Sequence, residues 1–211
     1  MNVGGISKRL LGLADAIVGR LSGGLAHTNI LSSVFFGGLS GSSVADVSSL
    51  GRILIPAMKE RNYTAAYAAA VTAASALIAP ILPPSITLIL YGVVTGTSIG
   101  QLFFAGIVPA IILMATLMIT VLLTVKRRGF DKESLATVDP KEIGRTPKKD
   151  IPALLPAFLA AIPALMLPVL ILVGIRGGIF TPTEAAAMAV AYSVLIGALV
   201  YRELTPRKII Q

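Results

Sequence analysis

A cluster of small polar residues lies in the middle of an apolar stretch near the start of the chain. There, Ser40, Ser42 and Ser43 are separated by Gly41 and followed by Asp46. Hydroxyl and backbone carbonyl oxygens are ligands that hard cations prefer. A lipid bilayer has no water to satisfy a broken backbone, so flexible polar residues at that depth need a specific role. We predict that this segment is the tip of a re-entrant hairpin that helps to bind a cation.

A second interruption divides the next apolar stretch, residues 63–91. Three prolines within residues 80–84 directly precede Ser85. One proline in a helix interior costs about 3 kcal/mol, so three so close together exclude a regular helix. We predict a discontinuous membrane helix, with regular segments at 64–79 and 86–94 and an unwound piece between them.

The two breaks together could build an ion site and a substrate site. A helix that ends within the membrane exposes carbonyl groups at its C-terminus and N–H groups at its N-terminus. Carbonyl groups near Phe36 and Ala79 are expected to coordinate a cation such as Na⁺, and the N-termini near Val44 and Ile86 favour a carboxylate. The hydroxyl groups that could complete the cation shell belong to Ser40, Ser42, Ser43 and Ser85. Any one of these serines alone is better explained by close helix packing, so the prediction depends on both breaks.

Asp46 is the only formal charge between residues 21 and 51. A carboxylate inside a membrane segment is a candidate for binding a cation or a substrate. It could instead cap the first turn of the helix that follows Ser43 and complement the helix dipole. Two other polar residues of this segment, His27 and Asn29, are expected to form local hydrogen bonds.

Membrane helices must position these residues. Hydrophobic residues make up 55% of the chain and charged residues only 13%, against about a quarter in soluble domains. Residues 62–125, 151–175 and 185–201 contain no charged side chain at all, and apolar stretches of about 18 residues or more are typical of membrane spans. The sequence therefore predicts an all-α integral membrane protein with a re-entrant helical hairpin and both discontinuous and continuous transmembrane helices.

This fold class divides the chain into five parts. They are an amphipathic interfacial helix (1–23), the re-entrant hairpin (24–51), the broken transmembrane helix and the transmembrane helix after it (62–125), a cytoplasmic linker (126–150), and two further transmembrane helices (151–211). A short polar connector is expected at 52–61.

Local patterns define the two outer helices further. An apolar face recurs at spacings of three and four in the first helix, although a helix packed on the rest of the protein would show the same pattern. That face consists of Ile6, Leu10, Leu13, Ile17 and Leu21. Near the other end, Thr181 and Glu184 flank Pro182, which predicts a capping box at the start of the last helix.

The distribution of basic residues distinguishes a hairpin from a simple span at residues 25–50. A single crossing would place residues 1–20 on the opposite side of the membrane from most basic connectors. A hairpin that returns to its own side places 17 of the 18 basic residues on one face, with only Arg176 on the other. The positive-inside rule favours the hairpin and makes the basic face cytoplasmic.

Several classes of function fit poorly. The net charge of +8 is explained by cytoplasmic loops, and without basic–aromatic runs the sequence does not indicate nucleic-acid binding. One histidine and no cysteine cannot build a transition-metal site. The stretch around Ser40 resembles a nucleophile elbow, but Ser42 stands where the last glycine belongs. Since there is also no Walker A or dinucleotide-binding motif, we expect no enzyme activity and no cofactor.

The motifs as a set resemble the large membrane subunit of tripartite ATP-independent periplasmic (TRAP) transporters, the DctM-type family. The resemblance runs in order along nearly the whole chain. It is carried by GGLAHTNI (23–30), SGSSVAD (40–46), AVTAAS (70–75), PPSI (83–86), YG (91–92) and GGIFTPTEA (177–185).

This resemblance implies Na⁺-coupled secondary import of organic acids, such as C4-dicarboxylates, by an elevator-type motion. The implied partners are a small TRAP membrane subunit and a periplasmic solute-binding protein, in the inner membrane of a bacterium or archaeon. In the family, the first hairpin tip and the adjacent broken helix form a Na⁺ site beside the substrate. That assigns Ser40, Gly41, Ser42, Pro83, Pro84 and Ser85 to the cation, with Na⁺ as coupling ion, and leaves Ser43 and Asp46 as candidates for the substrate.

The family has two inverted repeats, and this chain resembles the later part of the first repeat and the beginning of the second. A second hairpin and a second broken helix are not found in the sequence. The alternative to a partial transporter subunit is therefore a membrane scaffold or an inactive fragment that transports nothing.

Overall fold

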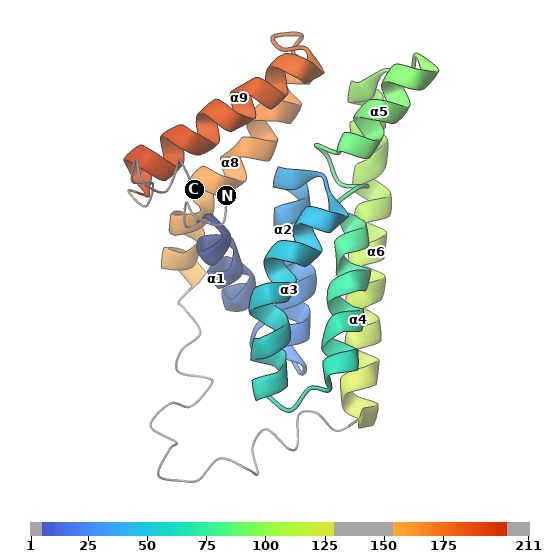
Figure 1. Ribbon diagram of the computed structural model, residues 1–211, viewed down its shortest axis with the longest axis vertical. Coiled ribbons are helices and arrows are strands. Elements are labelled where there is room, and N and C mark those ends of the chain that lie inside the picture. The colour runs from blue at the N-terminus through green and yellow to red at the C-terminus, as the bar shows by residue number, and fades with distance from the viewer. Residues whose placement is uncertain (1–5, 129–153, 202–211) are drawn as a thin grey trace.

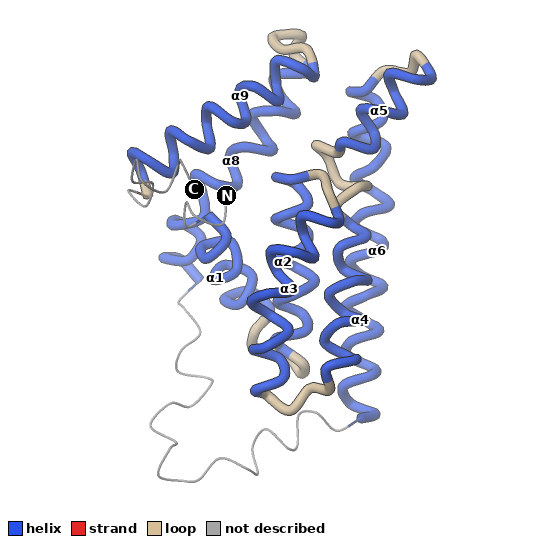
Figure 2. Tube along the Cα trace, in the orientation of Figure 1, coloured by secondary structure: helices blue, strands red, loops and turns tan. Residues whose placement is uncertain are grey.

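The structure is a computed structural model that describes residues 6–128 and 154–201. Across these ranges every regular element is a helix, as the sequence predicts (Figures 1 and 2). The α-helices are α1 (Ile6–Val18), α2 (Gly24–Ser40), α3 (Ser43–Glu60), α4 (Ala65–Ser75), α5 (Ile86–Thr95), α6 (Ile99–Arg128), α8 (Leu154–Arg176) and α9 (Pro182–Leu195).

Helices α2 and α3 form a hairpin whose tight turn consists of Gly41 and Ser42. Gly41 has a φ of 58°, in the left-handed region that glycine enters without steric cost, and its N–H donates to the Gly37 carbonyl at 2.9 Å. The Ser42 hydroxyl accepts a hydrogen bond from the Ala45 N–H at 3.4 Å and so caps α3. The two helices run side by side away from this turn (Figure 1).

Helix α3 continues to Glu60, so the prediction of a polar connector at 52–61 is wrong. Leu50, Leu54 and Met58 recur every four residues and are each at most 1% exposed. Such a stripe buries one face of a helix, while the charged residues of this segment lie on its exposed side. These charges belong to an amphipathic helix rather than to a loop.

The predicted discontinuous helix is confirmed. Helix α4 tightens into a 3₁₀ turn at Ala76–Ile78, and α5 begins only at Ile86. The Ser85 hydroxyl accepts a hydrogen bond from the Leu88 N–H at 3.2 Å, which caps the second half. The break at residues 79–85 therefore ends in a serine cap, as the hairpin turn also does.

Two helices, Ile99–Arg127 and Leu154–Arg176, are long and apolar enough to cross a membrane. They contain the expected spans at 102–125 and 151–175, apart from residues 151–153, which lie outside the described residues. Most of the predicted linker also lies outside them, and its first three residues form the end of α6. After α9 the chain continues as a π-helix, Ile196–Val200.

Helix α1 packs on α2 and α8, which is the alternative that the sequence left open. Leu10 and Leu13 of the predicted apolar face are buried, but Ile17 and Leu21 are 48% and 46% exposed. The helix ends at Val18, so Leu21 does not continue its face. A position in the membrane interface remains a prediction.

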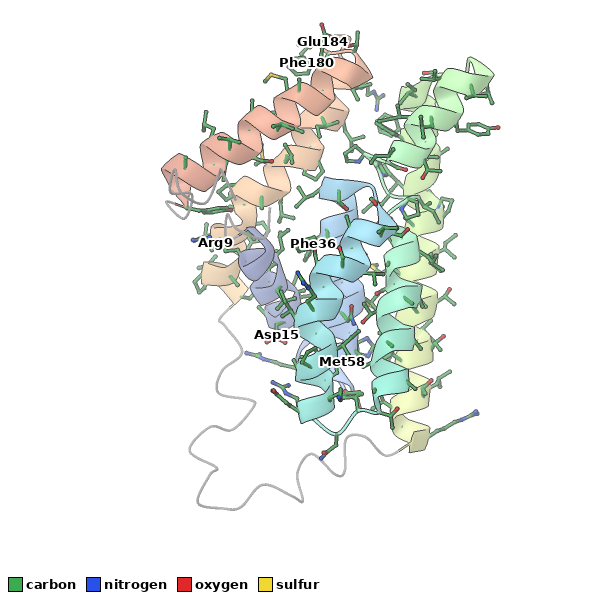
Figure 3. All side chains as sticks on the ribbon, viewed as in Figure 1. Arg9, Asp15, Phe36, Met58, Phe180 and Glu184 are labelled. Atoms are coloured by element: carbon green, nitrogen blue, oxygen red, sulfur yellow. The ribbon has the colours of Figure 1, made fainter. Side chains whose placement is uncertain are left out.

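The capping box at the start of α9 is confirmed. The Thr181 hydroxyl accepts a hydrogen bond from the Glu184 N–H at 3.3 Å, and the Glu184 carboxylate accepts one from the Thr181 N–H at 2.8 Å. The Thr181 hydroxyl also donates to this carboxylate at 2.8 Å, and the two bonds from the Thr181 N–H and hydroxyl lower the pKa of Glu184. Glu184 lies at the start of α9 (Figure 3). The loop between α8 and α9 is thereby tied to the first turn of α9.

Replacing Thr181 with alanine is expected to lower the free energy of unfolding by about 1 kcal/mol, because the Glu184 N–H loses its acceptor and the Glu184 carboxylate loses the hydroxyl that donates to it. Reversible unfolding of the purified protein in mixed micelles measures this change. The capping prediction fails if Thr181→Ala is no less stable than Thr97→Ala, which removes a threonine from an exposed loop.

Candidate functional site

The hairpin turn and the helix break lie in direct backbone contact. A Cβ atom placed on Gly41 would lie 2.5 Å from the Pro84 carbonyl oxygen and 2.9 Å from the Ser85 Cα. One turn earlier, a Cβ on Gly37 would lie 2.8 Å from the Ala79 Cα. Side chains at either glycine would separate the two segments. The structure therefore brings together the two features that the sequence singled out independently.

The hydroxyl groups at this contact form short-range hydrogen bonds. The Ser40 hydroxyl pairs with the backbone of Ser42, at 3.4 Å to its N–H and 3.5 Å to its carbonyl. The Ser85 hydroxyl donates to the Pro80 carbonyl at 2.6 Å while it accepts from the N–H at the start of α5. Each of these oxygens keeps a lone pair. The donor set consists of hydroxyl and carbonyl oxygens, which suits a hard cation such as Na⁺.

A cavity of about 430 Å³ opens beside the contact. Ser40 comes from the hairpin, Pro84 and Ser85 from the break, and Ser193 from α9. The remaining walls are apolar side chains of α2, α5, α6, α8 and α9. A volume of this size is typical of small-molecule sites, and the serines give it one polar end.

Asp46 lies away from this cavity, inside the first turn of α3. Its side chain is 1% exposed, and neither carboxylate oxygen has a hydrogen-bond partner among the described residues. The hydroxyl of the neighbouring Ser33 donates to the Ser75 hydroxyl at 3.0 Å. Ser42 rather than Asp46 caps the helix by hydrogen bonding. Asp46 is therefore a buried carboxylate with unused oxygen ligands.

A polar contact between α2 and α4, which includes the Ser33 beside Asp46, was not predicted from the sequence. The Asn29 amide donates to the Thr72 hydroxyl at 2.7 Å, so the expectation of a local hydrogen bond for Asn29 is wrong. Ser33 and Ser75 form a second bond one turn along. The sequence does place Asn29 and Ser33 on one face of α2, four residues apart, and Thr72 and Ser75 on one face of α4, three residues apart, but it does not show that these two faces meet.

No group of three or more histidine, cysteine or acidic residues that could hold a metal ion occurs in the part of the chain that the structure describes.

The comparison with known proteins identifies the family. The model of the tripartite ATP-independent periplasmic transporter, DctM component, matches residues 1–211. A sialic acid TRAP transporter permease from Haemophilus influenzae is 40% identical over 205 residues, which are 97% of this chain and 31% of that protein.

Two further relatives match to the same extent. The 2,3-diketo-L-gulonate TRAP transporter large permease of Escherichia coli is 40% identical over 97% of this chain and 45% of its own length. The isethionate TRAP transporter permease of Oleidesulfovibrio alaskensis is 42% identical over 97% of this chain and 30% of its own length. This chain thus spans less than half of the length of these relatives. Members of the family are membrane transporters rather than enzymes. The chain belongs to the DctM family of TRAP transporter large permeases.

Proposed function

We propose that this chain is part of a Na⁺-coupled secondary transporter that imports organic acids, C4-dicarboxylates among them. The single observation that carries the proposal is the backbone contact between Gly41 and Pro84–Ser85 at one end of the cavity. Interrupted helices that meet at a cavity supply carbonyl groups for a cation and N–H groups for a carboxylate. The family membership supports a transport role for this geometry.

The proposed ligands of Na⁺ come from Ser40, Gly41, Ser42 and the sequence from Pro83 to Ser85. Ser43 and Asp46, at the start of α3, are the proposed contacts for substrate or for a second cation. The unused carboxylate oxygens of Asp46 support such a role, since a buried carboxylate needs a partner.

The hairpin is proposed to be re-entrant. Its two free ends, at Gly24 and Glu60, lie at the end of the molecule where α6 also ends (Figure 1). Gly106 of α6 packs against Ile81 in the break, about two turns from the start of α6. Because the turn contacts this break, it lies within the length of α6 and not at its end. The proposed position is multi-pass in the inner membrane, with the basic end in the cytoplasm, and the positive-inside rule supports this orientation.

The proposed partners are a small TRAP membrane subunit and a periplasmic solute-binding protein. The relatives named above are described as TRAP permeases for sialic acid, diketogulonate and isethionate. Their names do not specify the acid that this chain carries. The competing proposal is a membrane scaffold that moves nothing.

The test combines transport with ion binding. The chain is reconstituted with its candidate partner subunits, and uptake of labelled succinate is measured with Na⁺ and with K⁺ outside. Thermal unfolding of the purified chain is recorded in the same two salts. We expect uptake and a thermal shift that require Na⁺. Absence of both leaves the scaffold as the better description.

Ser42→Ala and Ser85→Ala are each expected to weaken the apparent affinity for Na⁺ about tenfold, which corresponds to one lost ligand. The Na⁺ response that measures this affinity is the Na⁺-dependent thermal shift together with the Na⁺-dependent uptake. Both serines also cap helices. Thr64→Ala is the matched control, because Thr64 caps α4 by the same kind of bond but lies far from the turn in the sequence and is exposed. A Na⁺ response that falls equally in all three variants would show that cap loss, and not cation binding, explains the effect.

A further inference from the structure

A second pocket, of about 410 Å³, lies between the start of α6 and the end of α8. It is lined by Ser98, Gly100, Gln101 and Phe104 from α6 and its preceding turn, and by Ile175 and Arg176 from α8. In contrast to the cavity at the hairpin turn, this pocket combines a full positive charge with an amide and a hydroxyl group. A carboxylate accepts hydrogen bonds from guanidinium, amide and hydroxyl groups of this kind.

Arg176 is held in place by an aromatic ring. Its guanidinium carbon lies 4.8 Å from the centre of the Phe104 ring. Stacking of this kind uses the face of the guanidinium group, while its N–H donors point outward from the edge in a rigid fork. The ring therefore orients the donors without using them, which lowers the entropic cost of binding an anion.

Neighbouring groups leave this charge available. The carboxylate closest to it along the chain, that of Glu184, accepts hydrogen bonds from the N–H and the hydroxyl of Thr181, both at 2.8 Å. The Ser98 hydroxyl accepts a bond from the Gln101 N–H at 3.5 Å, so its own proton remains free to be donated. The Ser98 hydroxyl can therefore donate to an anion beside Arg176, while the Glu184 carboxylate is hydrogen-bonded to Thr181.

The pocket adjoins the cavity at the hairpin turn. Ile175 lines both spaces, and Phe103, which lines the cavity, is followed by Phe104, which lines the pocket. Within residues 6–128 and 154–201, Arg176 is the only basic residue at this end of the molecule, at the end of α8 and opposite the basic ends of α3 and α6 (Figure 1). A carboxylate bound here would be one side chain away from the cavity.

We propose that Arg176, Gln101 and Ser98 form an entrance site that binds the carboxylate group of a small organic acid before it reaches the cavity. Its role as an entrance depends on the proposed transport function, but binding of the carboxylate does not. The site differs from the residues assigned above to cation and substrate.

Equilibrium dialysis of labelled succinate against the purified chain in zwitterionic detergent tests the site, in K⁺ buffer so that Na⁺ coupling plays no part. We expect Arg176→Gln to weaken succinate binding about tenfold or more, as expected for loss of a charge-assisted pair of hydrogen bonds. Arg52→Gln is the matched control, since it removes an exposed arginine midway along α3 that does not line the pocket, and it should change nothing. Succinamide, which lacks the charge, should bind to neither protein.

Several results would overturn the proposal. These are no succinate binding at all, equal affinity in Arg176→Gln and Arg52→Gln, or equal binding of succinamide. Loss of binding in Ser85→Ala but not in Arg176→Gln would place the acid in the cavity instead. If succinate binding depends on Arg176 while the Na⁺ response is absent, the entrance site stands and the proposed Na⁺ coupling fails.

Discussion

Replacing Gly41 with alanine is expected to lower the free energy of unfolding by about 2–5 kcal/mol and to remove the Na⁺-dependent thermal shift. Two costs add in this estimate. A non-glycine residue at a φ of 58° costs about 1–2 kcal/mol, and forcing the new methyl group against backbone atoms costs about 1–3 kcal/mol. Its nearest neighbours would be the Pro84 carbonyl oxygen at 2.5 Å and the Ser85 Cα at 2.9 Å. Neither can rotate away as a flexible side chain would.

The chain offers a control that separates these two costs. Gly96 ends α5 with a φ of 68°, but a Cβ there would meet nothing within 4 Å. Gly96→Ala should therefore show the backbone cost alone and keep the Na⁺ response. Unfolding in mixed micelles and thermal shifts in Na⁺ and K⁺ measure both variants. Equal losses of stability in the two would mean that contact between the turn and the break contributes nothing.

Replacing Asp46 with asparagine is expected to raise the free energy of unfolding, in contrast to Gly41→Ala. In Na⁺-free buffer this variant should be more stable than the unmodified chain by about 2–4 kcal/mol, because it removes a buried carboxylate that has no partner among the described residues. The same substitution should reduce the stabilisation by Na⁺, because the carboxylate is proposed to contact a cation. A gain in stability joined to a loss of ligand response is the pattern expected of a residue retained for function.

Asp15 provides the comparison for Asp46. Its carboxylate lies on α1, is half-buried and accepts a hydrogen bond from the Thr28 hydroxyl at 3.1 Å. Asp15→Asn should leave stability unchanged or lower it slightly, and should not alter the Na⁺ response. A destabilised Asp46→Asn in Na⁺-free buffer would contradict the interpretation of Asp46 as an unpaired carboxylate.

Local chemistry explains why the breaks could be predicted from sequence. Three prolines before Ser85 prevent a continuous helix wherever they occur, and Gly41 followed by Ser42 combines a left-handed turn with a helix cap. The capping box at Thr181 depends in the same way on neighbouring residues only. Such features require no knowledge of distant parts of the chain, and the structure confirms each of them.

Tertiary contacts explain what could not be predicted. From the sequence alone, the charged residues of 52–61 are typical of a loop. In the structure, the buried stripe of Leu54 and Met58 shows that one face of α3 is covered. The partner of Asn29 lies 43 residues away on α4, and nothing in the sequence near Asn29 identifies it. The apolar wall that α8 and α9 add to the cavity depends equally on how separate helices meet.

The hydrogen bonds between α2 and α4 have a mechanical consequence. Asn29 with Thr72, and Ser33 with Ser75, fasten the hairpin to the first half of the broken helix at two buried points. Directional bonds of this kind resist sliding, whereas the apolar side chains of α8 and α9 across the cavity can shift past their neighbours at little cost. Hairpin and broken helix should therefore move as one rigid block, which preserves the spacing of the proposed ion ligands while the opposite wall of the cavity opens or closes.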